Sequence, residues 1–315
     1  MKQIISLLRL IRWLNLFFIA LTQYLVQYTI IKPILAQAQI ETTLNDFTFL
    51  LLVLSTILIA AGGYVINDYF DVKIDEVNKP KRIFIDRVIP RRAAMLLHQF
   101  LSGLGIVIAI YVAWQAGSLK LSLVHPLVAA FLWFYSTGYK RRLLAGNIIV
   151  AFLSGFVVLI VALYEQHLFS LTDSSAIAPA YSIFIITFFY FVFSFLVSFA
   201  RELVKDMEDI EGDRKYNCKT IPIVFGIEKA KWLTYLLLGL VLTMLIYFQW
   251  MQVNGNDFVS ALTIFTTLEF PVLISFYLLK KANGSQQFSS VSSVLKIVMF
   301  MGIMSMVYFY FIMKI

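Results

Sequence analysis

The chain has 315 residues, of which 60% are hydrophobic and only 14% are charged, with a formal net charge of +8. Soluble domains carry roughly 25% charged residues, so this composition excludes an ordinary soluble enzyme and favours a membrane protein. The single cysteine, Cys218, excludes an intrachain disulfide, and no cluster of Cys and His suggests a zinc site.

Apolar runs of about 20 residues recur along the chain, and each is long enough to cross a hydrocarbon core of about 30 Å. Because the runs are continuous rather than alternating, they predict helices and not the strands of a barrel. The fold class is therefore predicted as an all-α polytopic membrane protein, with residues 1–315 forming a single intramembrane domain. Residues 1–12 are predicted as an amphipathic segment at the membrane surface. The nine predicted transmembrane helices cover residues 13–35, 47–66, 92–114, 123–137, 146–164, 180–200, 229–250, 257–279 and 292–313.

The distribution of basic residues predicts the orientation of these helices. All but four of the 26 Lys and Arg lie in the N-terminal tail or in the loops that follow the even-numbered helices. Positive residues are retained on the cytoplasmic side, so the tail and these loops are predicted in the cytoplasm and the C-terminus outside, most simply in the cell (inner) membrane. Because the basic residues are dispersed among membrane loops, the net charge does not predict nucleic-acid binding.

Two segments that follow predicted helices carry carboxylates at the same spacing. The sequence "NDYFDVKID" holds Asp68, Asp71 and Asp75, and "KDMEDIEGD" holds Asp206, Asp209 and Asp213. On a helix the positions i, i+3 and i+7 fall within an arc of roughly 60°. Each segment therefore predicts three carboxylates on one helical face at the membrane surface.

Three neighbouring carboxylates repel one another unless a cation lies among them. Sites made only of oxygen ligands suit Mg²⁺, which commonly joins carboxylates to substrate phosphates. A solvated helix end is the alternative for one such triplet, whereas two matching triplets on the same predicted side favour metal binding. Basic residues near the triplets would complete an anion site. Those predicted to contact phosphate are Arg82, Lys140, Arg201 and Lys205.

No glycine-rich phosphate loop, nucleophile elbow or kinase motif is found. The predicted substrate is therefore a diphosphate carried on a lipid tail, because a site at the membrane edge suits such a molecule. A membrane transporter is the main alternative from another class. Transporters place carboxylates near the bilayer midplane, whereas here the acidic residues gather at one face.

These residues resemble a known family, the UbiA-type intramembrane prenyltransferases. "GGYVINDYFDVKIDEVNKP" is similar to the family's first aspartate motif, "YSTGYKRRLLAGN" to its Tyr…Lys segment, and "RELVKDMEDIEGDRKYNCKTIPIVFG" to its second aspartate motif. The resemblance covers about residues 8–230. Within the family, "RELVKDMEDIEGD" most resembles the geranylgeranylglycerol-phosphate geranylgeranyltransferases. After the first motif the chain reads "KRIFIDRVIPRR", which departs from the R-P-x-x-S-G-like stretch of many members.

The resemblance implies a nine-helix bundle with a cytoplasmic-side active site and Mg²⁺-dependent transfer of a prenyl group from an allylic diphosphate. The implied acceptor is the hydroxyl of a prenylglycerol phosphate, which gives an ether lipid; an aromatic acceptor is the alternative. Membrane lipids surround the chain, and no obligate protein partner is predicted. In the implied roles, Asp68, Asp71 and Asp75 bind one Mg²⁺ with support from Asn67, and Asp206, Asp209 and Asp213 bind a second. Arg82, Lys140, Arg201 and Lys205 bind the substrate phosphates, and Tyr135 assists catalysis together with Lys140.

Overall fold

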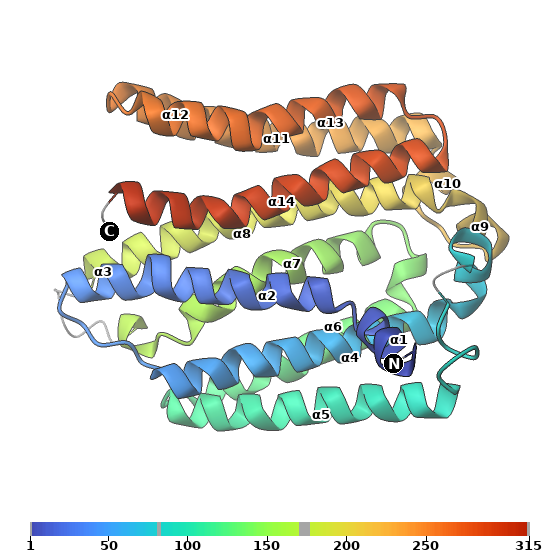
Figure 1. Ribbon diagram of the computed structural model, residues 1–315, viewed down its shortest axis with the longest axis horizontal. Helices are drawn as coiled ribbons and strands as arrows, with labels where there is room; N and C mark the ends of the chain where they lie inside the picture. The colour runs from blue at the N-terminus through green and yellow to red at the C-terminus, as the bar shows by residue number, and fades with distance from the viewer. Residues whose placement is uncertain (1, 81–82, 170–176, 314–315) are drawn as a thin grey trace. The chain divides into compact units, whose positions relative to one another are not determined.

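The computed structural model describes residues 2–80, 83–169 and 177–313 (Figure 1). It consists of two compact units. Unit 1 comprises residues 1–140, 156–189 and 306–315, and unit 2 comprises residues 141–155 and 190–305. The single domain predicted for residues 1–315 therefore stays a prediction, and each unit is described below by itself.

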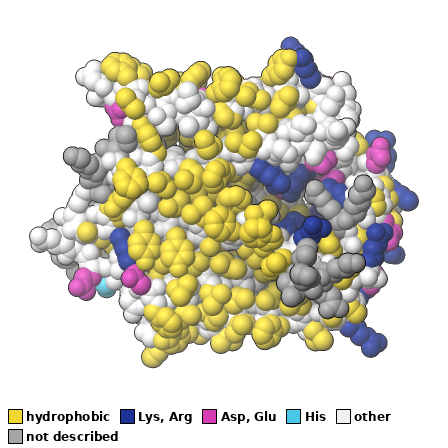
Figure 2. Space-filling model, viewed as in Figure 1, with side chains coloured by type: hydrophobic (Ala, Val, Ile, Leu, Met, Phe, Trp, Pro, Cys, Tyr) yellow, Lys and Arg dark blue, Asp and Glu magenta, His cyan; other side chains and the backbone are white. Residues whose placement is uncertain are grey.

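Within the described ranges, nine helices are long and apolar enough to cross a membrane, which confirms the predicted all-α polytopic architecture. Hydrophobic side chains cover much of the face seen in Figure 2, as expected for a surface that meets lipid. The candidate spans are Trp13–Gln37, Asp46–Asn78, Arg91–Gln115, Leu119–Thr137, Ala145–Leu163, Ile177–Glu208, Ile227–Asn254, Phe258–Lys281 and Ser285–Tyr308.

Unit 1 contains the N-terminal spans. Helix α4 begins after Asn45, whose side-chain oxygen accepts a hydrogen bond from the backbone N–H of Thr48 and so caps the helix. The helix continues 12 residues beyond its predicted end at residue 66, so it carries the first aspartate motif without interruption. The elements of this part are α1 (Lys2–Leu10), α2 (Trp13–Leu25), the π-helical segment η1 (Val26–Ile31), α3 (Lys32–Gln37), α4 (Asp46–Asn78), α5 (Arg91–Gln115), the 3₁₀ turn η3 (Leu119–Leu123) and α6 (Val124–Thr137).

Helices α7 and α8 contribute to both units, and the elements after α8 belong mainly to unit 2. The fourth predicted span, which is short, is extended at its start by the 3₁₀ turn η3. The remaining elements are η4 (Tyr139–Arg141), α7 (Ala145–Leu163), η5 (Gln166–Phe169), α8 (Ile177–Glu208), α9 (Ile210–Lys215), α10 (Ile221–Val224), α11 (Ile227–Asn254), α12 (Phe258–Ile264), the π-helical segment η7 (Phe265–Glu269), α13 (Phe270–Lys281) and α14 (Ser285–Met313).

In unit 1, α4 and α5 lie side by side (Figure 1) and approach closely at two glycines. A Cβ atom on Gly62 would lie 2.4 Å from Oγ of Ser102, and one on Gly105 would lie 2.7 Å from Cγ1 of Ile59. Small residues let membrane helices pack at short distance, where dispersion replaces the missing hydrophobic force. This packing holds α4, and with it the first aspartate motif, against α5.

We expect Gly105→Leu to destabilise the protein by about 1–3 kcal/mol, because the new side chain would overlap Ile59 and the backbone of Ser55. Gly103, two residues earlier on the same helix, has open space around the position of its Cβ. Gly103→Leu is therefore the matched control. The measurement is the thermal unfolding midpoint of the purified protein in detergent. Equal midpoints for the two variants would contradict the close packing of α4 on α5.

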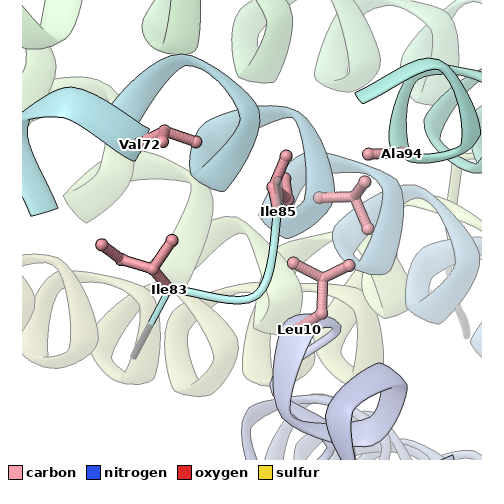
Figure 3. Close-up of a cluster of buried hydrophobic side chains, with 6 residues drawn as sticks. Leu10, Val72, Ile83, Ile85 and Ala94 are labelled. Atoms are coloured by element: carbon pink, nitrogen blue, oxygen red, sulfur yellow. The ribbon is translucent and has the colours of Figure 1, made fainter. Parts of the chain in front are cut away.

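A buried cluster anchors the segment that follows the first motif. Leu10 of α1, Val65 and Val72 of α4, and Ala94 of α5 pack with Ile83 and Ile85. In Figure 3 the labelled side chains of this cluster point toward one another, with Ile83 and Ile85 on the extended segment between α4 and α5. Burial of these apolar groups positions the segment beside the motif-bearing end of α4.

In unit 2, the later part of α8 packs against α7 and α14. A Cβ on Gly155 of α7 would lie 2.7 Å from the ring of Phe191, and one on Gly302 of α14 would lie 2.4 Å from the ring of Phe193. The hydroxyl of Tyr190 hydrogen-bonds with that of Ser305 at 3.0 Å. These contacts fix the helix that leads into the second aspartate motif.

Candidate active site

Asp71 is the most deeply placed carboxylate of the first motif, with only 4% of its surface exposed. Its Oδ2 atom accepts a hydrogen bond of 2.8 Å from Nδ2 of Asn67, one turn earlier on α4. The same oxygen accepts a hydrogen bond from Nζ of Lys140, which follows α6. A buried carboxylate requires such partners, so Asn67, Asp71 and Lys140 form one connected group.

Asp68 pairs with a residue from the N-terminal segment. Nη2 of Arg12 donates a hydrogen bond of 2.7 Å to Oδ1 of Asp68, and its guanidinium lies 4.8 Å from the ring centroid of Tyr64. Arg12 stands between α1 and α2 with a left-handed backbone (φ 54°). The turn from α1 into the first span thus brings a cation to the first motif.

Asp75 completes the motif at the end of α4. It interacts electrostatically with both Asp71 and Asp68, as expected for three carboxylates on one helical face. Asp68 and Asp75 line a small pocket of about 10 Å³ together with Val72 and residues 83–85. This volume is near the lower limit for one water molecule, so the segment after α4 closely covers the carboxylates.

Tyr135, a further residue predicted from the sequence, lies near this group. Tyr135 interacts electrostatically with both Arg12 and Lys140. Burial, the largest single effect, lowers the pKa of Lys140, but the interactions with Asp71, Tyr135 and Asp75 together raise the pKa well above its ordinary value. The pKa of Arg12 is raised in the same way by Asp68, Tyr64 and Tyr135 together, against the effect of burial. Both side chains are therefore cations at the first motif.

Arg82, also predicted to contact phosphate, lies outside the described residues.

The second motif is built differently from the first. Helix α8 ends at Glu208 and α9 begins at Ile210, with Asp209 between them at φ −97° and ψ 10°. The backbone N–H of Asp209 still bonds to the carbonyl of Lys205 (2.8 Å), and that of Asp213 to the carbonyl of Asp209 (3.2 Å), so the prediction that Asp206, Asp209 and Asp213 share one helical face stays a prediction. The Asp213 residue is buried (7% exposed). Its backbone carbonyl oxygen accepts a hydrogen bond of 2.9 Å from the backbone N–H of Cys218.

The basic residues of this motif share a buried carboxylate. Oε1 of Glu202 accepts a hydrogen bond of 2.7 Å from Nζ of Lys205 and one of 3.3 Å from Nη1 of Arg201. Nε of Arg201 is buried and has no hydrogen-bond partner among the described residues. Asn147 of α7 donates a hydrogen bond of 2.8 Å to Oδ2 of Asp206. The motif therefore offers carboxylates together with an unsatisfied guanidinium N–H.

The donor set of the first motif fits Mg²⁺. Oδ1 of Asn67 is buried without a hydrogen-bond partner in the described structure, and it belongs to the same side chain that binds Asp71. In the described ranges no group of three or more His, Cys, Asp or Glu side chains is gathered closely enough to enclose a metal ion. Carboxylate and amide oxygens are ligands that suit Mg²⁺, which completes its shell with phosphate oxygens and water.

Three residues at these motifs were not among the predicted site residues. Arg12 lies in the basic N-terminal tail, and Glu202 lies in the segment "RELVKDMEDIEGD". Asn147 lies in the segment "YSTGYKRRLLAGN" that carries the family resemblance, so that resemblance could have identified it. Nothing in the local sequence of Arg12 or Glu202 indicates the ion pairs that they form.

The sequence matches the profile of the UbiA prenyltransferase family over residues 15–311. Among characterised proteins, it is 31% identical over 196 residues to the digeranylgeranylglyceryl phosphate synthase of Hyperthermus butylicus, a match that covers 61% of this chain and 60% of that protein. It is 32% identical to the synthase of the same name from Methanothrix thermoacetophila over 78% of this chain and 83% of that protein. The chain thus spans less than two thirds of the first of these relatives.

Solved structures share the fold. A structure from a study of digeranylgeranylglyceryl phosphate synthase in membranes is similar with a TM-score of 0.63 and 24% identity, over 98% of this chain and 99% of that one. A UbiA homologue from Archaeoglobus fulgidus, solved with GPP and Mg²⁺ bound, is similar with a TM-score of 0.57 and 17% identity, over 95% and 99% of the two chains. These similarities confirm the predicted UbiA-type helical architecture.

Proposed function

The chain belongs to the UbiA prenyltransferase family, and we propose that it transfers a prenyl group from a geranylgeranyl-like diphosphate to the hydroxyl of a prenylglycerol phosphate. The observation that carries this proposal is the buried group of Asn67, Asp71 and Lys140, which places an oxygen donor set beside a cation at the end of a membrane helix. The names of the relatives from Hyperthermus butylicus and Methanothrix thermoacetophila support the choice of acceptor.

Each aspartate motif would hold one Mg²⁺. Asp68, Asp71 and Asp75, supported by Asn67, are the proposed ligands at the first motif, and Asp206, Asp209 and Asp213 are those at the second. The Mg²⁺ bound to the A. fulgidus homologue together with GPP supports this cofactor. When bound, Mg²⁺ supplies a Lewis acid that stabilises negative charge on the departing diphosphate.

The basic residues near the two motifs are proposed to bind the phosphate groups of the donor. Lys140, Arg201 and Lys205 donate hydrogen bonds to carboxylates in the described structure. We propose that they turn to the phosphate oxygens of the donor when it binds, together with Arg82. Hydrogen-bond donors around the diphosphate stabilise the negative charge that develops on it in the transition state. The buried, unsatisfied Nε of Arg201 is a donor of this kind.

In the proposed reaction, the bond between the allylic carbon and the diphosphate oxygen breaks and diphosphate leaves with the electron pair. The acceptor hydroxyl forms a new C–O bond with the allylic carbon and loses its proton, which gives an ether. The cationic carbon must be protected from water until the acceptor attacks. The apolar spans provide such an environment, and the ring of Tyr135 is proposed to flank the cation.

The proposed location is the cell membrane, with the N-terminus and the loops that carry both motifs in the cytoplasm and the C-terminus outside. The support is the asymmetry of Lys and Arg between the two sides of the predicted spans. With this orientation, Mg²⁺ would reach the motifs from the cytoplasm, and the diphosphate product would be released to the cytoplasm.

The acceptor is tested directly with the purified protein. We expect incorporation of a labelled geranylgeranyl group into a prenylglycerol phosphate in the presence of Mg²⁺, and loss of incorporation when a chelator removes the metal. A set of aromatic acids offered in parallel serves as the comparison. Transfer only to the aromatic acids would replace the proposed acceptor, and transfer unaffected by chelator would contradict the proposed role of Mg²⁺.

A further inference from the structure

Unit 2 contains a second pocket that the proposed reaction does not use. It has a volume of about 610 Å³ and lies between α11 and α13, within the range typical of small-molecule sites. Glu228, Lys231 and Tyr235 line it from α11, and Leu273, Phe276, Tyr277 and Lys280 line it from α13. The lining positions recur every three or four residues on each helix, so one face of each helix borders the pocket.

The pocket is charged at one end and apolar at the other. Lys231 lies near the start of α11 and Lys280 near the end of α13, so both ammonium groups belong to the same end of this antiparallel pair. Leu273 lies seven residues before Lys280, which corresponds to about 10 Å along the helix axis. Tyr235 and Phe276 stack between these levels, with their ring centroids 5.4 Å apart. A ligand that fills the pocket must therefore carry a polar group and an apolar chain.

The net charge at the polar end is positive. Lys231 is only 5% exposed, and its Nζ lies 3.2 Å from Oε1 of Glu228. The Glu228 side chain is itself 86% exposed, so its charge is largely screened by solvent. Lys280 has no ion-pair partner among the residues that the structure describes. The polar end thus presents one buried and one unpaired ammonium group.

We infer that this pocket binds the phosphate headgroup of an anionic membrane lipid. Ammonium groups bind phosphate as point charges, and basic pockets between membrane helices on the cytoplasmic side recognise anionic headgroups. The phosphate lies between Lys231 and Lys280, and an acyl chain follows Leu273 and Phe276 into the bilayer. This lipid is distinct from the prenyl donor and acceptor, and its binding needs neither Mg²⁺ nor diphosphate.

The test is equilibrium binding of a fluorescent short-chain phosphatidic acid to the full-length protein in neutral detergent, without Mg²⁺ or prenyl diphosphate. We expect Lys280→Gln to weaken binding about fivefold, which is the typical effect of one lysine near an anionic lipid. Glu228→Gln should strengthen binding, because it removes the only carboxylate that lines the pocket. Opposite effects of these two exposed substitutions would not arise from a general loss of folding.

Lys229→Gln is the matched control, because Lys229 lies two residues before Lys231 on α11, has its Nζ 5.5 Å from the ring centroid of Phe225 and does not line the pocket. Its affinity should equal that of the unmodified protein, whereas Lys231→Gln should weaken binding as Lys280→Gln does. The inference would be overturned if Lys280→Gln bound the lipid as tightly as the unmodified protein, or if Lys229→Gln lost as much affinity as Lys280→Gln. Displacement by equimolar inorganic phosphate would assign a free-anion site instead, and equal binding of phosphatidylcholine would exclude recognition of the charge.

Discussion

Replacing Asp71 by asparagine should abolish prenyl transfer while leaving the protein folded. Asparagine has nearly the shape of aspartate, so the 4% exposed position can still accept hydrogen bonds from Asn67 and Lys140. It cannot provide the negative charge that a divalent cation requires. We expect the rate of transfer to fall by about a thousandfold, as when a main source of transition-state stabilisation is removed. The measurement is incorporation of the labelled prenyl group at saturating Mg²⁺.

Glu76→Gln provides the control for Asp71→Asn. Glu76 lies on the same helix α4, and its replacement by glutamine removes one negative charge as Asp71→Asn does. The Glu76 side chain, however, is exposed. Its activity should stay within about twofold of the unmodified protein, since surface substitutions usually have small effects. Normal transfer by Asp71→Asn, or an equal loss in Glu76→Gln, would contradict the role of Asp71. The thermal midpoint of each variant in detergent establishes that the protein is folded.

Replacing Lys140 by methionine should reduce both stability and transfer. Lys140 keeps 31% of its side chain exposed, whereas the Asp71 side chain that it neutralises is only 6% exposed. Removing one partner of such a pair leaves a buried charge with weaker compensation, at a cost on the order of 3 kcal/mol. Asn67 still donates one hydrogen bond, so folding should persist. The measurements are the unfolding midpoint without Mg²⁺ and the rate of prenyl transfer with it.

The double variant Lys140→Met with Asp71→Asn separates the two effects of Lys140. Without a buried charge, the protein should recover most of the stability that Lys140→Met loses, because the two residues are directly coupled. Its transfer activity should remain absent. Mg²⁺ should also raise the midpoint of Lys140→Met alone, because a bound cation supplies the missing positive charge. A midpoint for the double variant as low as that of Lys140→Met would contradict the ion pair.

The membrane architecture could be predicted from the sequence because each span must satisfy its own backbone within the bilayer. This constraint acts locally, so the nine apolar runs indicate nine helices whatever their packing. The i, i+3, i+7 spacing of Asp68, Asp71 and Asp75 likewise predicts a shared face, because all three lie on the uninterrupted helix α4.

For Asp206, Asp209 and Asp213 the shared helical face stays a prediction. The spacing is identical, but α8 ends at Glu208 and a new helix begins at Ile210. Residue spacing alone does not reveal a helix break of this kind. The boundaries of helices are therefore the least accurate part of a prediction from sequence.

The sequence by itself determined the nine spans, the two aspartate motifs and the family, because these depend on local composition and on spacing along the chain. Only the tertiary structure decided which side chains from distant parts of the sequence contact the two aspartate motifs. Arg12 reaches Asp68 from 56 residues away in sequence, Lys140 reaches Asp71 from 69, and Asn147 reaches Asp206 from 59. A hydrogen bond between residues so far apart depends on how helices pack, and helix packing depends on contacts such as Gly105 against Ile59 that no local pattern encodes.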